Sequence, residues 1–179
     1  MKDWKLWKLI VLLFGSYFGL NAIFGFILYT ATGNIGDLFG SSDSFRLWID
    51  MILAPTLAAP GIKLLETGWE ASIDAFFATL LNLLYFIPGI VSAILIGFFA
   101  KNSKIAFRIV FFFFILLTLL NVGLYFTGAV FWSLAWVYDY LSLPLPVAIQ
   151  WIIFSGLIHS IFHGGIAGQI RNLMRRKQL

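Results

Sequence analysis

The chain has 179 residues, of which 61% are hydrophobic and only 11% are charged, and its mean hydropathy is +0.95. Soluble domains carry about 25% charged residues, so this composition excludes an ordinary soluble domain and predicts a single membrane domain over residues 1–179. The lack of cysteine excludes disulfides, thiolate metal ligands and a thiol nucleophile. The net charge of +4 is explained by basic residues that flank the predicted spans, and it does not indicate a nucleic-acid partner.

The first predicted membrane span covers residues 9–29, which contain no formal charge. A helix of about 20 apolar residues crosses the hydrocarbon layer, and this run is longer than the core of a typical signal peptide. Asn21 lies within the span, and an amide at that depth needs a hydrogen-bond partner from another helix. We therefore expect this span to be retained and to pack inside a bundle.

The longest segment outside the predicted spans is residues 31–70, which we place on the extracytoplasmic side. Apolar and charged residues are mixed in its second half, and Pro55 and Pro60 prevent one continuous helix. We expect short interfacial helices lying along the membrane surface. A re-entrant hairpin over residues 47–65 is the alternative, since irregular backbone enters a membrane where protein shields it.

Three further spans are predicted at residues 76–100, 108–131 and 147–168, and residues 169–179 form a basic tail. The predicted fold class is therefore an all-α integral membrane protein with four transmembrane helices. Four consecutive phenylalanines early in the third span would cover every side of a helix, which indicates that part of this span faces lipid.

The distribution of charge predicts the orientation of the chain. Ten of the twelve basic residues lie in the terminal segments or near the turn between the second and third spans: Lys2, Lys5, Lys8, Lys101, Lys104, Arg108, Arg171, Arg175, Arg176 and Lys177. All acidic residues except Asp3 lie on the opposite side. The positive-inside rule then places both termini in the cytoplasm, where the basic tail is also suited to contact anionic lipid headgroups.

The second and last spans share a pattern of small residues when they are aligned at an offset of 67 residues. The first and third spans align at an offset of 100, which pairs Asn21 with Asn121. Both pairs run in the same direction, so the pattern suggests two parallel two-helix repeats. Small residues let helices approach closely in lipid, and we assign one set to helix packing: Gly89, Ala93, Gly97, Gly156, Ser160, Gly164 and Ala167.

His159 and His163 are four residues apart and so share one helical face, the spacing that helical metal sites use. Zinc takes three or four protein ligands, and neither cysteine nor a carboxylate at the centre of a span completes such a set. A haem held between two histidines would need two copies of the chain. We expect hydrogen bonds to neighbouring helices as their main role, with contact to a proton or substrate, or to a metal or haem, as alternatives, and we predict no cofactor.

The residue pattern holds no nucleophile with its base, no paired carboxylates at depth and no phosphate loop, so it supports no enzyme activity. The leading hypothesis is a non-catalytic multi-pass membrane subunit that serves as a scaffold, assembly or interaction protein. Its partners would be the lipid bilayer and another protein or a second copy of the chain. The alternative is a small transporter or channel with a polar path through Asn21, Asn82, Asn121, Gln150, His159 and His163. A haem or metal carrier using the two histidines is a third hypothesis.

Overall fold

The computed structural model describes residues 4–31, 35–40, 44, 48, 75–126 and 145–176. The elements in these ranges are α-helices, as the composition predicts: α1 (Leu6–Ala31), α2 (Ile35–Gly40), α5 (Ala75–Phe99), α6 (Ser103–Phe126) and α8 (Leu145–Arg176). Residues 47–65, for which interfacial helices or a re-entrant hairpin are expected, lie outside the described residues apart from Trp48. The end of the third predicted span, beyond Phe126, also lies outside them.

Two of the helices are long and apolar enough to cross a membrane. These stretches are Leu6–Ile27 of α1, with mean hydropathy 2.0, and Ser103–Gly123 of α6, with mean hydropathy 2.5. A shorter apolar stretch, Phe86–Phe99, belongs to α5. The structure is thus all-helical, with two helices that have the length and composition of membrane spans.

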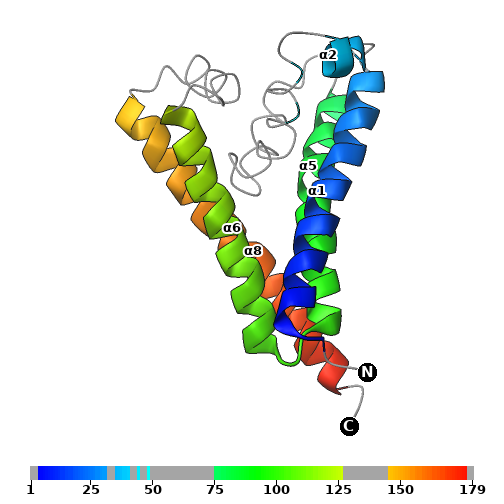
Figure 1. Cartoon of the computed structure of the whole chain (residues 1–179), viewed down its shortest axis with the longest axis vertical. Helices are drawn as coiled ribbons and strands as arrows, with labels where there is room; N and C mark the ends of the chain where they lie inside the picture. Colours follow the sequence, from blue (N-terminus) through cyan, green and yellow to red (C-terminus); the bar gives the residue numbers. More distant parts are fainter. Residues whose placement is uncertain are drawn as a thin grey trace.

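The four long helices form two arms that diverge from the end carrying both chain termini (Figure 1). One arm pairs α1 with α5, and the other pairs α6 with α8. Near the junction, Trp4 stacks on Phe99 with ring centroids 4.5 Å apart, and its backbone N–H donates to the Phe99 carbonyl at 3.3 Å. Higher along the first arm, the Ser16 hydroxyl donates to the Ser92 hydroxyl at 2.9 Å.

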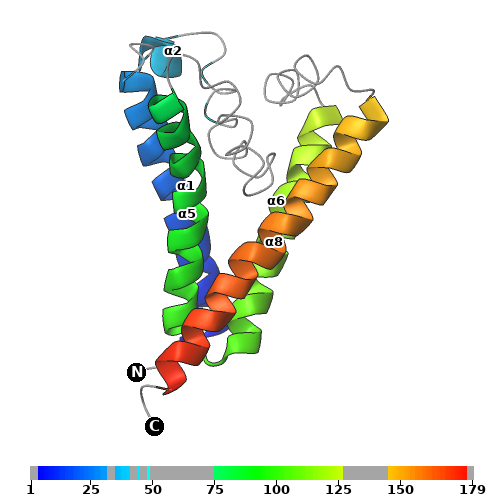
Figure 2. The same ribbon diagram turned by 180° about the vertical axis from the view of Figure 1, so that it is seen from behind.

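Glycines set the distance between helices in the second arm and at the junction, where α8 crosses α5 (Figure 2). A Cβ atom on Gly156 would collide with the Thr118 side chain of α6. A Cβ atom on Gly97 would come within 2.7 Å of the Ala167 carbonyl oxygen. A larger residue at either position would force the helices apart, which explains why close packing here needs glycine.

The ends of two helices differ from the predicted spans for local reasons. Helix α6 begins at Ser103, before the predicted start, because the Asn102 side-chain oxygen accepts the Ile105 N–H at 2.9 Å and caps the first turn. Helix α8 continues past residue 168 into the basic tail and ends at Arg176. The tail contains good helix formers, and Arg175 and Arg176 interact favourably with the negative end of the helix dipole.

Candidate functional site

The candidate site is the pair of histidines on α8, both of which are 1% exposed. Their rings stack in parallel, with centroids 5.3 Å apart and an interplanar angle of 1°. The Nδ1 atom of His163 lies 2.9 Å from the His159 carbonyl oxygen. Because a carbonyl oxygen only accepts, Nδ1 donates this hydrogen bond, and in the neutral imidazole Nε2 of His163 then carries the lone pair.

Aromatic rings from two other helices enclose the histidine pair. Phe114 of α6 stacks on His163 at 4.5 Å and 14°, and it also lies nearly parallel to His159 at 5.9 Å. Phe86 of α5 stacks on His159 at 6.0 Å and 23°. The imidazoles therefore occupy the contact between the two arms and are packed as flat aromatic groups.

Gly89 of α5 provides the space for the His163 ring. A Cβ atom on Gly89 would lie 2.5 Å from Nε2 of His163, with Cδ2 and Cε1 at 3.0 and 3.1 Å. These distances show that the Nε2 vertex of the ring points at the glycine, and Nε2 has no hydrogen-bond partner among the described residues. An atom bound in line with this lone pair, at the 2.0–2.1 Å of a metal–nitrogen bond, would collide with the α5 backbone.

Two of the predicted site asparagines are buried on helices α1 and α6. Asn121 of α6 is 0% exposed and Asn21 of α1 is 4% exposed. The Tyr17 side chain lies beside that of Asn21, and its ring makes an edge contact with Phe114 at 5.5 Å. Phe114 thus joins Tyr17 on α1 to the histidine pair on α8 through one set of ring contacts.

The remaining predicted site residues differ in their surroundings. Gln150, near the start of α8, is exposed, while the side chain of Asn82 lies outside the described part of α5. All seven residues assigned to helix packing are buried: Gly89, Ala93, Gly97, Gly156, Ser160, Gly164 and Ala167. Among the described residues, no group of three or more His, Cys, Asp or Glu side chains is placed to hold a metal ion.

Sequence reasoning did not identify Phe114 as part of the site, because it lies within a run of four phenylalanines. In the structure Phe112 is 63% exposed, whereas Phe114 is 1% exposed. Thr118 and Asn121 follow Phe114 at intervals of four and three residues and are buried on the same face. Two polar residues within an otherwise apolar run were the sequence feature that could have identified the inward face of α6.

Comparisons with known proteins return no match: no family model, no curated protein and no solved structure is significantly similar to this chain.

Proposed function

We propose that the chain is a four-span integral membrane protein that serves as a non-catalytic scaffold or assembly subunit. Helices α1 and α6 have the length and composition of membrane spans. Helices α5 and α8 have 25 and 32 residues, which is more than the roughly 20 residues needed to cross a bilayer. Large apolar side chains are exposed on three of the long helices, including Val11 on α1, Leu119 on α6 and Ile161 on α8. Lipid is a more favourable surrounding than water for such a surface.

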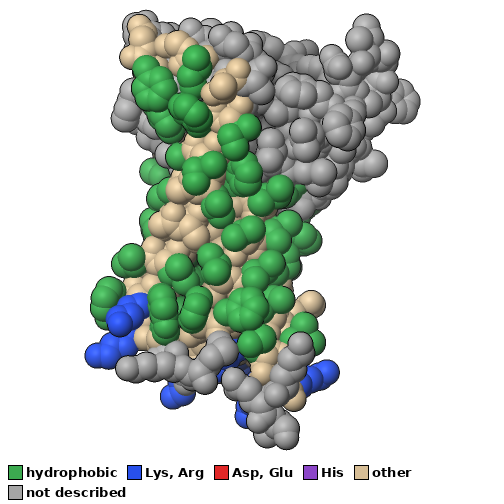
Figure 3. Space-filling view, turned by 90° about the vertical axis from the view of Figure 1, so that its right-hand side faces the viewer, with side chains coloured by type: hydrophobic (Ala, Val, Ile, Leu, Met, Phe, Trp, Pro, Cys, Tyr) green, Lys and Arg blue, Asp and Glu red, His purple; other side chains and the backbone are tan. Residues whose placement is uncertain are grey.

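The proposed orientation has both termini in the cytoplasm. The end of the molecule that carries both termini also carries a group of basic residues (Figure 1 and Figure 3): Lys5, Lys8, Lys101, Lys104, Arg108, Arg171, Arg175 and Arg176. Cytoplasmic ends of spans are enriched in lysine and arginine, which supports this orientation.

The observation that best supports an assembly role is a Gly-x-x-x-Gly face on α1. A Cβ atom on Gly15 or Gly19 would meet no described atom within 4 Å, whereas Gly89, Gly97 and Gly156 are in close contact with neighbouring helices. Such a face lets a second helix approach closely in lipid, where packing and not the hydrophobic effect drives association. We infer that it binds a transmembrane helix of a partner subunit.

The surroundings of the histidines favour this function over a transport path or a metal carrier. A path for solutes needs polar atoms that face an open lumen, and a metal needs open space in line with a ligand lone pair. His159 and His163 are instead stacked between Phe86 and Phe114, with the Nε2 atom of His163 directed at Gly89. This arrangement supports a packing role for the pair.

The assembly role is tested by native purification of the full chain in mild detergent, followed by mass spectrometry of the intact complex. The double variant Gly15→Leu, Gly19→Leu should lose the mass of the partner, which also identifies it as a second copy or another protein. Gly123→Leu is the matched control, because Gly123 is exposed on α6 with no described atom within 4 Å of an added Cβ. Full retention of the partner by the double variant, or solute flux by the purified chain in liposomes, would contradict the proposal.

The proposed orientation has a separate test, which the absence of cysteine makes straightforward. Single-cysteine variants Lys8→Cys and Arg175→Cys should react with an impermeant maleimide only after the cytoplasmic side is opened. Labelling of either site in intact cells would refute the orientation without bearing on the partner face.

A further inference from the structure

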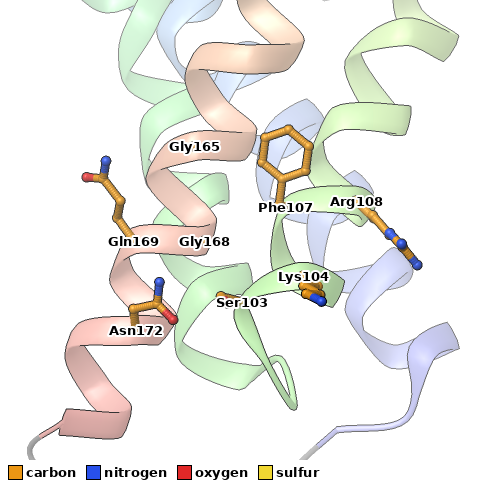
Figure 4. Close-up of a pocket in the computed structure, with 8 residues that line it drawn as sticks. All are labelled: Ser103, Lys104, Phe107, Arg108, Gly165, Gly168, Gln169 and Asn172. Atoms are coloured by element: carbon orange, nitrogen blue, oxygen red, sulfur yellow. The ribbon is translucent and has the colours of Figure 1, made fainter.

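A pocket of about 390 Å³ lies between the beginning of α6 and the last third of α8, at the basic end of the molecule. Figure 4 shows Lys104 and Arg108 on one side, Gln169 and Asn172 on the other, and the Phe107 ring between them. Three small residues, Ser103, Gly165 and Gly168, complete the lining. The eight residues that line the pocket are Ser103, Lys104, Phe107, Arg108, Gly165, Gly168, Gln169 and Asn172.

Three glycines of α8 shape this region in two different ways. A Cβ atom on Gly164 would come within 3.1 Å of the Phe107 ring, and one on Gly168 within 3.5 Å of the Ser103 carbonyl oxygen. These two glycines therefore hold α8 close to α6. By contrast, a Cβ atom on Gly165 would meet no described atom within 4 Å, so the absence of a side chain at this position keeps the pocket open.

The chemistry of the lining suits an anion. Lys104 and Arg108 bring two positive charges to the edge of the pocket and Asn172 brings an amide, and the lining contains no acidic residue. The Arg108 guanidinium and the Gln169 amide extend outward from the two helices (Figure 4). The pocket also adjoins the first turn of α6, where the helix dipole contributes partial positive charge. Planar guanidinium and amide groups bind phosphate oxygens well, and arginine does so with two parallel hydrogen bonds.

The surface next to the pocket suits an acyl chain. Phe111, one helical turn above Phe107, stacks on it with ring centroids 5.5 Å apart. Ile161, one turn above Gly165 on α8, is 59% exposed. A ligand with its phosphate among the basic residues would therefore place an attached hydrocarbon chain against apolar side chains at the depth of the membrane.

We propose that this pocket binds the phosphate headgroup of an anionic membrane lipid, an inference that rests on the membrane location proposed above. Basic pockets between transmembrane helices on the cytoplasmic side are suited to such headgroups. The polar residues at the start of α6 and the end of α8 then act as a lipid-binding site, and the bound lipid joins the two helices of the second arm at their cytoplasmic end.

The test uses the full-length chain in mild detergent, titrated with phosphatidylglycerol or phosphatidylcholine and followed by native mass spectrometry. We expect preferential binding of phosphatidylglycerol. The variant Lys104→Gln, Arg108→Gln should weaken that binding about thirtyfold, since each of the two basic groups contributes on the order of 1 kcal/mol. The matched control Arg175→Gln, Arg176→Gln makes the same change of charge at the same end. It should change the affinity by less than about twofold, because neither arginine lines the pocket and exposed charges without direct contact contribute little.

A second variant, Gly165→Leu, fills the pocket without changing the charge and should also weaken binding of phosphatidylglycerol. Equal losses in the pocket and control charge variants would overturn the proposal, because they would indicate attraction to the whole basic end. Displacement of the lipid by millimolar inorganic phosphate would show that the pocket takes free phosphate instead. A chain that alkaline carbonate washes off membranes would refute the membrane location itself, whereas a chain that stays embedded but binds both lipids equally would refute only the headgroup site.

Discussion

The Nε2 atom of His163 lies 2.5 Å from the point that a Cβ atom on Gly89 would occupy. This relationship joins the two arms, because Gly89 belongs to α5 and His163 to α8. The ring has little freedom to retreat, since Phe114 stacks on its face at 4.5 Å and its Nδ1 atom is bonded to the His159 carbonyl. Gly89 is therefore needed as a glycine for steric reasons.

Gly89→Ala should destabilise the protein by about 1–2 kcal/mol. Overpacking costs about 1–3 kcal/mol, and the better helix propensity of alanine offsets up to about 1 kcal/mol of this. The loss should appear as a lower midpoint when the detergent-solubilised chain is heated and the folded fraction is measured by size exclusion.

The control for this prediction is Gly123→Ala, an exposed position on α6 where an added Cβ meets no described atom within 4 Å. That change should be neutral or slightly stabilising. Combining Gly89→Ala with His163→Ala should cost less than the sum of the two single changes, because the second change removes the colliding ring. Strict additivity would show that the two residues do not meet.

Gly156→Ala tests the packing of α8 against α6. An added Cβ would collide with the Thr118 side chain, whose hydroxyl donates to the Phe114 carbonyl at 2.7 Å and is thereby held in place. We expect a loss of about 1–3 kcal/mol in the same thermal assay. Partial recovery in the double variant with Thr118→Ala is expected, and an unchanged midpoint for Gly156→Ala alone would be inconsistent with this contact.

The described helices could be predicted from the sequence because long apolar runs carry that information locally. The predicted span at residues 76–100 nearly coincides with α5, Ala75–Phe99. The pattern of small residues also marks positions that are buried in the structure, including Gly89 and Gly156.

The partners of those positions were not predictable, because they depend on which helices meet and in what register. Nothing local to Gly89 indicates that it faces His163, which is far away in the chain. Likewise, Phe112 and Phe114 have the same side chain and similar neighbours in the sequence. The first is exposed and the second is buried because they lie on different faces of α6.

Arg171 provides a third prediction. Its Nε and Nη2 atoms donate to the Lys101 carbonyl oxygen at 3.3 and 3.1 Å, which ties α8 to the turn between α5 and α6. Hydrogen bonds from a charged donor contribute about 1.5–3 kcal/mol, so Arg171→Gln should cost about 1–2 kcal/mol in the thermal assay. Arg175→Gln, which changes an exposed arginine on the same helix, should have almost no effect. Equal midpoints for the two variants would show that the bond to the turn does not stabilise the fold.

Two phenylalanines of α6 that are two positions apart, Phe112 and Phe114, allow a matched comparison of one substitution in two surroundings. Phe114 contacts Tyr17 at 5.5 Å and stacks on His163, so Phe114→Leu removes aromatic contacts that join three helices. Each such pair contributes about 0.5–1.5 kcal/mol beyond its buried area, and we expect a total loss of about 2 kcal/mol. Phe112→Leu changes a ring that is 63% exposed and should stay within about 0.5 kcal/mol of the parent. If both variants melted at the same temperature, the aromatic contacts of Phe114 would not be what holds α1, α6 and α8 together.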